Sequence, residues 1–278
     1  MLRRSVISNV TINGKGAGRL ETTMRLRQIC LVVEDISAAE DALTQIFGLA
    51  VGERAAGVGK FGLDNFLIPI GGDFLEVVAP TRDGTAAGRF LERRKGDGGY
   101  MAIFQCDDGL AYRERITSRG VRLIWSRSDR DDYTPSQYHP RDCHGTILAV
   151  GSVDGGDRRD EMGDWPPARD HWRAHVRRDI TQSLAGAEMQ TGNPKVSAEL
   201  WSDLLATPLR TIGPDAYALS FDNAEMRFVE AIDGRGDGLG GIDLRVGDKA
   251  HVRREAAARG IPVADGRLVV CGMRVRLV

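Results

Sequence analysis

The chain has 278 residues, of which 42% are hydrophobic, and its formal net charge is −1. These values are typical of a soluble globular protein that is long enough for one large domain or two ordinary ones. The near-neutral charge balance gives no electrostatic reason to expect a nucleic acid or an acidic membrane surface as a partner.

The cysteines and the N-terminus indicate the compartment. Four cysteines, Cys30, Cys106, Cys143 and Cys271, lie far apart without a CxxC pair, which argues against a zinc knuckle or a disulfide framework. No apolar run has the length of a signal peptide or a membrane span. We therefore expect a cytoplasmic protein with no membrane partner. Residues 1–23 lack hydrophobic periodicity, so we expect a disordered tail there, and Met24 is an alternative start.

The first predicted secondary-structure elements begin at residue 29. The run "ICLVV" is β-branched and apolar, as in a strand buried on both faces. Ser37 with Glu40 forms a capping-box pattern that predicts a helix start, and Gly48 is suited to end that helix. The runs "FGLDNFLIPIGG" and "DFLEVVAP" then predict two strands joined by a turn. The unit is β-α-β-β, with room for one more strand in residues 50–62.

The same order of elements returns three times. The second copy is "YMAIFQC", a helix from Asp108 to Gly120, and "HGTILAV"; the third is "LAGAEMQT", a helix capped at Asn193, "YALSFDN" and "EMRFVEA". The fourth is "GIDLRV", a helix from Asp248 to Gly260, "GRLVVC" and "GMRVRLV". Four copies of one supersecondary unit indicate a repeat architecture, although an unrelated α+β chain could show such agreement by chance.

The repeats predict a domain organisation. We expect a first domain over residues 24–150, with modules 24–82 and 97–150, and a second, more degenerate domain over residues 180–278. Residues 151–179 are rich in Gly, Pro and charge, which is typical of a linker.

Paired modules with a strand, an Asp, a capped helix and a Gly resemble the vicinal oxygen chelate superfamily. This superfamily includes glyoxalase I, methylmalonyl-CoA epimerase, the extradiol dioxygenases and the bleomycin-resistance proteins. The segment "YHPRDCHGTILAV" is also similar to the end of the second module in epimerase-like members. The resemblance implies an α+β fold in which four βαβββ modules form two cup-shaped mixed sheets. It also implies a divalent metal held by the first and last strand of each module, which can stabilise an enediolate or bind dioxygen.

The residues at these ligand positions depart from the family pattern. The first module offers Gln28 and Glu76, but the second offers Met101 and Ala149, which are a soft thioether and a methyl group. The second half offers Gly186, Arg227, Gly241 and Arg276, which cannot hold a cation. We therefore expect no metal and no other cofactor, with a non-standard divalent metal site as the open alternative.

The resemblance places a small-molecule site in the first cup. Strand alternation directs several of its side chains toward one cavity, and the loop before the last strand adds residues at the rim. The expected ligand-binding residues are Gln28, Cys30, Phe74, Glu76, Met101, Ile103, Tyr138, His139, Ile147 and Ala149. The competing interpretation is that they are ordinary core, with Gln28 and Glu76 satisfied by water and each other.

Three functions remain open. The first is a metal-free protein that binds a small organic molecule, as resistance members of the superfamily do. The second is a lyase or isomerase of the glyoxalase or epimerase type, in which Glu76, with a pKa raised by burial, acts as general base. The third is a purely structural role with the cup filled by side chains. Assembly as a homodimer also stays open.

Overall fold

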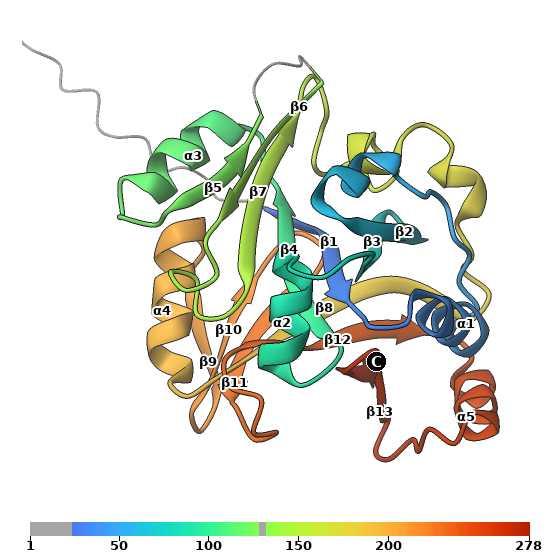
Figure 1. The fold of residues 1–278 in the computed structure, drawn as a ribbon. Coiled ribbons are helices and arrows are strands. Elements are labelled where there is room, and N and C mark those ends of the chain that lie inside the picture. The colour runs from blue at the N-terminus through green and yellow to red at the C-terminus, as the bar shows by residue number, and fades with distance from the viewer. Residues whose placement is uncertain (1–23, 128–131) are drawn as a thin grey trace, which may run out of the picture.

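Two seven-stranded mixed sheets, with five α-helices around them, form the part of the chain that the structure describes (Figure 1). The computed structural model describes residues 24–127 and 132–278. The tail expected over residues 1–23 lies outside the described residues. None of the helices in the described ranges is both long and apolar enough to cross a membrane.

The first sheet has the strand order β2-β3-β1-β4-β7-β6-β5. Parallel pairs β1–β3 and β4–β7 flank the antiparallel pair β1–β4 at its centre. The elements of the first half of the chain are β1 (Arg25–Val32), α1 (Ile36–Phe47), η1 (Ala56–Phe61), β2 (Leu63–Ile70), β3 (Asp73–Pro80), α2 (Ala86–Arg94), β4 (Gly98–Gln105), α3 (Gly109–Thr117), β5 (Leu123–Ser126), β6 (Tyr133–Tyr138) and β7 (Ile147–Val153).

The second sheet repeats this plan with the order β13-β14-β12-β8-β11-β10-β9. Two short 3-10 helices, η2 (Pro166–Ala168) and η3 (Trp172–His175), lie in the connection between the sheets. The elements of the second half are β8 (Thr181–Thr191), α4 (Pro194–Leu205), β9 (Leu209–Gly213), β10 (Ala216–Ser220), β11 (Glu225–Glu230), β12 (Gly238–Val246), α5 (Lys249–Ala258), β13 (Arg267–Val270) and β14 (Met273–Leu277).

The repeat is complete in the inner modules and reduced in the outer ones. The modules that begin with β4 and β8 each have one helix and three further strands. In the first and last modules, one strand shrinks to a single bridge, between Glu53 and Leu67 and between Ala264 and Arg267. The predicted α+β class with four related modules in two sheets is thus confirmed.

Local capping explains where the helices begin, with one correction. Asp35, rather than Ser37, caps α1, because its carboxylate accepts hydrogen bonds from the backbone N–H groups of Ser37 and Ala38, both at 2.9 Å. Aspartate is as good a cap as serine, and it stands where the strand ends. Gly48 ends the helix in the left-handed conformation, with φ +63°, as predicted.

The two sheets share one hydrophobic core. Side chains such as Leu26 and Phe104 from the first half and Met189 and Leu239 from the second belong to the same buried cluster. Close approach of β4 and β12 requires a glycine, because a Cβ on Gly99 would lie 2.7 Å from the Leu239 side chain. A second cluster covers the opposite, concave face of the first sheet, where the expected site lies.

Candidate functional site

The concave face of the first sheet brings most of the predicted site residues together. The register places Cys30 on β1 beside Glu76 on β3 and Met101 on β4, and it places Met101 beside Ile147 on β7. One cluster therefore contains Cys30, Phe74, Met101, Ile103, Ile147 and Ala149, none of them more than 8% exposed.

Tyr138 and His139 are placed differently from that set. Tyr138 ends β6 and lies within the core that the two sheets share, on the other face from the expected cavity. His139 follows it in the loop before β7, and it lines a cavity at the edge of the first cup. Strand alternation explains the separation, because neighbouring residues of a strand point to opposite faces.

The connection between the halves covers the floor of the first cup. Trp165, Ala168 and Trp172 from this connection belong to the same concave cluster. The Trp172 ring meets Phe74 edge-on at a centroid distance of 5.0 Å, and the connection runs beside β2 (Figure 1). We call residues 158–176 the strap. Its apolar side chains cover the concave face on which the sequence predicted a ligand site.

A buried arginine anchors the strap. Arg27 lies at a register shift of β1, and its guanidinium carbon is 5.4, 5.5 and 6.0 Å from the ring centres of Phe74, Trp165 and Trp172. Its Nη2 donates to the carbonyl of Gly163 at 2.6 Å. Burial lowers the pKa of Arg27 to about 9, which is still well above neutrality. The cation therefore holds the strap by cation–π contacts and charged hydrogen bonds.

Both carboxylate oxygens of Glu76 accept hydrogen bonds from neighbouring side chains. Glu76 accepts from Gln28 Nε2 at 2.8 Å and from Asn65 Nδ2 at 2.7 Å, and it remains partly exposed. Gln28 Oε1 in turn accepts from Trp165 Nε1 at 2.7 Å. Burial raises the pKa of Glu76, and the hydrogen bonds from Asn65, Cys30 and Gln28 partly oppose this rise.

These contacts do not fit a divalent metal. The side-chain oxygens of Gln28 and Glu76 already accept hydrogen bonds. The donor to Gln28 is the indole N–H of Trp165, which cannot coordinate a metal ion. Met101 and Ala149 supply no hard donor at the other two family positions. Within residues 24–127 and 132–278, no three His, Cys, Asp or Glu side chains gather as metal ligands would.

The raised pKa of Glu76 predicts a pH effect on stability. The folded state holds this proton more tightly than the unfolded chain, whose carboxyl has an ordinary pKa near 4.5. Wild-type stability should therefore fall, relative to Glu76→Gln, as pH rises from about that value through the higher folded pKa. Urea unfolding of both proteins between pH 4 and 8 measures the difference. Asp73, whose pKa burial also raises, is common to both and cancels. Parallel pH profiles would contradict the assignment.

One part of the first cup remains open to solvent. A cavity of about 710 Å³ lies between α2, β4 and the loop before β7. Phe90 and Tyr100 form an apolar wall with their rings edge-on at 5.1 Å, next to Ile147. The cavity is lined by Ala86, Arg89, Phe90, Arg93, Arg94, Tyr100, Ile124, His139, Pro140, Arg141, His144, Gly145, Ile147 and Asp237.

The rest of this cavity is basic. Arg89, Arg93 and Arg141 are exposed at its rim. Arg94 is only 3% exposed, and its Nη1 donates to the carbonyls of residues 235, 236 and 237 at 3.1–3.2 Å. Its Nε and Nη2 are buried without a hydrogen-bond partner among the described residues. Burial lowers the pKa of Arg94, with the neighbouring Arg235 acting in the same direction.

Two histidines of the loop before β7 have one ring nitrogen engaged. His139 Nδ1 accepts from the backbone N–H of Arg141 at 3.1 Å. His144 Nδ1 lies 2.7 Å from Ser197 Oγ, and the residue adopts a positive φ of 54°. The loop is thereby tied to α4 of the second half, which fixes one side of the cavity.

The second cup contains charge where the family pattern has ligands. Gly186 lies opposite Asp243, and Gly241 lies opposite Glu188. The carboxylates of Glu188 and Asp243 are paired with arginines, including Arg227, which contacts both. Sequence reasoning missed the two acids because it followed the ligand positions alone. It also missed Arg94, because α2 was not among the predicted elements.

Comparison with known proteins agrees with the fold. Residues 29–205 match the model of the glyoxalase-like domain. The ethylmalonyl-CoA/methylmalonyl-CoA epimerase of Cereibacter sphaeroides is 24% identical over 132 residues, which cover 46% of this chain and 98% of that protein. A mutant of 4-hydroxymandelate synthase from Streptomyces coelicolor aligns with a TM-score of 0.64 at 16% identity, over 86% of this chain and 76% of that one.

A variant of methylmalonyl-CoA epimerase from Streptomyces coelicolor, solved with 2-nitronate-propionyl-CoA, is 22% identical over 47% of this chain and 98% of that chain, with a TM-score of 0.42. The family match spans more than half of the sequence, and the synthase alignment extends the shared fold across both sheets. The chain therefore belongs to the glyoxalase-like domain family of the vicinal oxygen chelate superfamily.

Proposed function

We propose that this protein binds a small organic anion, without a metal, in the open cavity at the edge of the first cup. The observation that carries the proposal is Arg94, a buried cation at the cavity wall. Its Nε and Nη2 donate a hydrogen bond to no residue in the described ranges. An unpaired buried donor on a charged group is costly. Both nitrogens are inaccessible in the ligand-free protein, so a carboxylate or phosphate in the cavity would accept from them after a local side-chain shift and offset that cost.

The remainder of the cavity suits the organic part of such a ligand. Its volume of about 710 Å³ lies within the range usual for small-molecule sites. Phe90, Tyr100 and Ile147 offer an apolar wall, and the exposed arginines at the rim would attract an anion from solution.

The relatives suggest a first compound to try. The epimerase of Cereibacter sphaeroides is named for ethylmalonyl-CoA and methylmalonyl-CoA, which combine a carboxylate, a short alkyl group and a thioester of coenzyme A. The carboxylate of such a compound would pair with Arg94, and the exposed Arg89, Arg93 and Arg141 would meet its phosphates.

Calorimetric titration of chelator-stripped protein with methylmalonyl-CoA, methylmalonate and coenzyme A tests the proposal. We expect saturable binding of at least one of them, weakened about tenfold or more in Arg94→Lys, which keeps the charge but loses the planar fork. Arg253→Gln, an exposed arginine on α5, is the matched control and should bind like wild type. Absence of binding by all three, or equal affinity in Arg94→Lys, would overturn the proposal. Binding only after a metal is added would overturn its metal-free part.

Proton transfer by Glu76 is a second candidate, favoured by the raised pKa and partial exposure of that carboxyl group. In this function, a lyase or isomerase of the epimerase type, Glu76 would remove a proton next to a carbonyl. Incubation with methylmalonyl-CoA in heavy water distinguishes the two. Deuterium incorporation that is lost in Glu76→Gln would support the enzyme. A bound but unlabelled compound would support the binding protein.

A further inference from the structure

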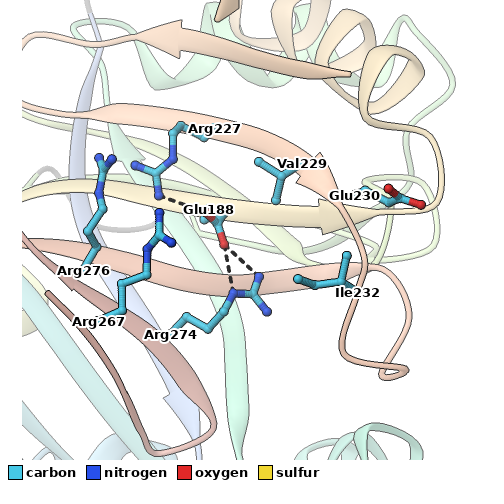
Figure 2. Close-up of a pocket in the computed structure, with 8 residues that line it drawn as sticks. All are labelled: Glu188, Arg227, Val229, Glu230, Ile232, Arg267, Arg274 and Arg276. Carbon is cyan, nitrogen blue, oxygen red and sulfur yellow. Dashed lines mark hydrogen bonds and ion pairs between the residues drawn. The ribbon is translucent and has the colours of Figure 1, made fainter. Parts of the chain in front are cut away.

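The second cup encloses a smaller cavity with four arginines. Its volume is about 310 Å³, and strands β8, β11, β13 and β14 supply most of its walls. Figure 2 shows the guanidinium groups gathered around Glu188 at one end, with Val229 and Ile232 toward the other. The residues that line it are Glu188, Arg227, Val229, Glu230, Ile232, Arg267, Arg274 and Arg276.

Two carboxylates hold three of these arginines in place. Asp243, 1% exposed, accepts from Arg276 Nε at 3.0 Å and Nη2 at 2.6 Å, and it also accepts two hydrogen bonds from Arg227. Glu188 accepts from Arg274 Nε at 3.0 Å and Nη2 at 2.8 Å, and from Arg227 Nη2 at 3.0 Å. Each of the three guanidinium planes is thereby fixed before any ligand arrives.

The fourth arginine has no such partner. Arg267 on β13 lies directly opposite Arg276 on β14, and it makes no ion pair or side-chain hydrogen bond with any residue in the described ranges. Like charges directly opposite one another in a sheet are destabilising. Even with Asp233, which reaches Arg274 at 3.4 Å, four arginines face three carboxylates, and Glu230 lies at the far end, away from them. This end of the cup, where Arg267 is exposed to solvent, therefore has an excess of positive charge.

We propose that the second cup is a binding site for a small anion, a carboxylate or a phosphate, with a short apolar group. The anionic end would lie between the planar fork of Arg267, which matches the oxygens of either group, and the N–H groups that Arg276 does not donate to Asp243. Val229 and Ile232 would contact the apolar end. The cavity volume is near the lower limit for ligand sites, which favours a small ligand. This site is separate from the cavity proposed in the first cup.

A site that concentrates like charge should be strained without its ligand. We expect Arg267→Gln to raise the melting temperature of the ligand-free protein, because it removes repulsion from Arg276 and breaks no ion pair. A purely structural Arg267 would instead show no change or a loss of stability on substitution. The control is Arg253→Gln, which removes an exposed positive charge far from either cup.

Thermal melts with increasing butyrate, inorganic phosphate and neutral butyramide test the binding. We expect a saturable rise in melting temperature with butyrate or phosphate, and the anion with the lower dissociation constant identifies the chemistry. Butyramide should have no effect. In Arg267→Gln the dissociation constant of the effective anion should increase at least tenfold, while Arg253→Gln and the first-cup variant Arg94→Lys should keep the wild-type value. No saturable shift with either anion, or an equal shift in Arg267→Gln, would overturn the proposal.

Discussion

Replacement of Trp165 by alanine is expected to lower the free energy of unfolding by about 3–5 kcal/mol. The indole is 1% exposed and lies at the centre of the strap, with its ring 5.1 Å from that of Tyr133. Its removal would leave a cavity over the concave face and take away a ring that faces the Arg27 cation. It would also leave Gln28 Oε1 without its donor. Chemical denaturation at constant pH measures the loss.

The matched variant Trp165→Phe separates packing from hydrogen bonding. Phenylalanine keeps most of the apolar volume and the face toward Arg27 but lacks the indole N–H. We expect it to cost about 1–3 kcal/mol, the range for a buried acceptor that loses its partner. If Trp165→Ala changed stability by less than about 1 kcal/mol, the strap would not be packed on the cup floor in solution, and the first cup would be open.

Replacement of Asp243 by alanine should have a comparably large effect, in the other half of the chain. Asp243 is buried between Arg227 and Arg276, so its loss leaves Arg276 without its ion-pair partner and Arg227 with Glu188 alone. Breaking a buried ion pair by removal of one partner costs about 3–5 kcal/mol. Denaturant unfolding of the Asp243→Ala protein measures this change.

A second substitution tests the cause of that loss. Arg227→Met in the Asp243→Ala background removes the more buried of the two cations that Asp243 paired and fills its space with an apolar side chain. We expect it to restore much of the lost stability, because apolar replacements of buried ion pairs are often neutral or stabilising. Glu188 keeps Arg274 as a partner in this double variant. Failure of the rescue would show that the loss arises from packing around Asp243 rather than from unpaired charge.

The architecture followed from the sequence because it depends on local signals. Each signal can be recognised within one short segment of sequence. These signals are an aspartate or asparagine before each repeated helix, an apolar run of strand length, and a glycine such as Gly48 at a helix end. Asp108, Asn193 and Asp248 cap their helices as the pattern predicted. Even the error at Ser37 moved the cap of α1 by only two residues, since both residue types serve as caps.

The candidate sites were less accessible to such reasoning. Strand alternation correctly predicted that Cys30 and Met101 share a face, because the period of two is a property of the strand alone. It could not reveal that Trp165, far away in the sequence, donates a hydrogen bond to Gln28. A segment rich in Gly, Pro and charge is typical of a linker, and only the apolar cup beneath it gives its two tryptophans a place to be buried.

The sequence by itself determined the repeated modules and the two mixed sheets, since each rests on residue type and short-range spacing. The tertiary structure alone decided which polar groups meet. It paired Glu188 and Asp243 with the arginines of β11 and β14, left Arg267 without a partner, and buried Arg94 at the edge of the first cup. The physical reason is that charge pairing and burial depend on contacts between strands and loops that are distant in the chain, and local sequence patterns do not encode those distances.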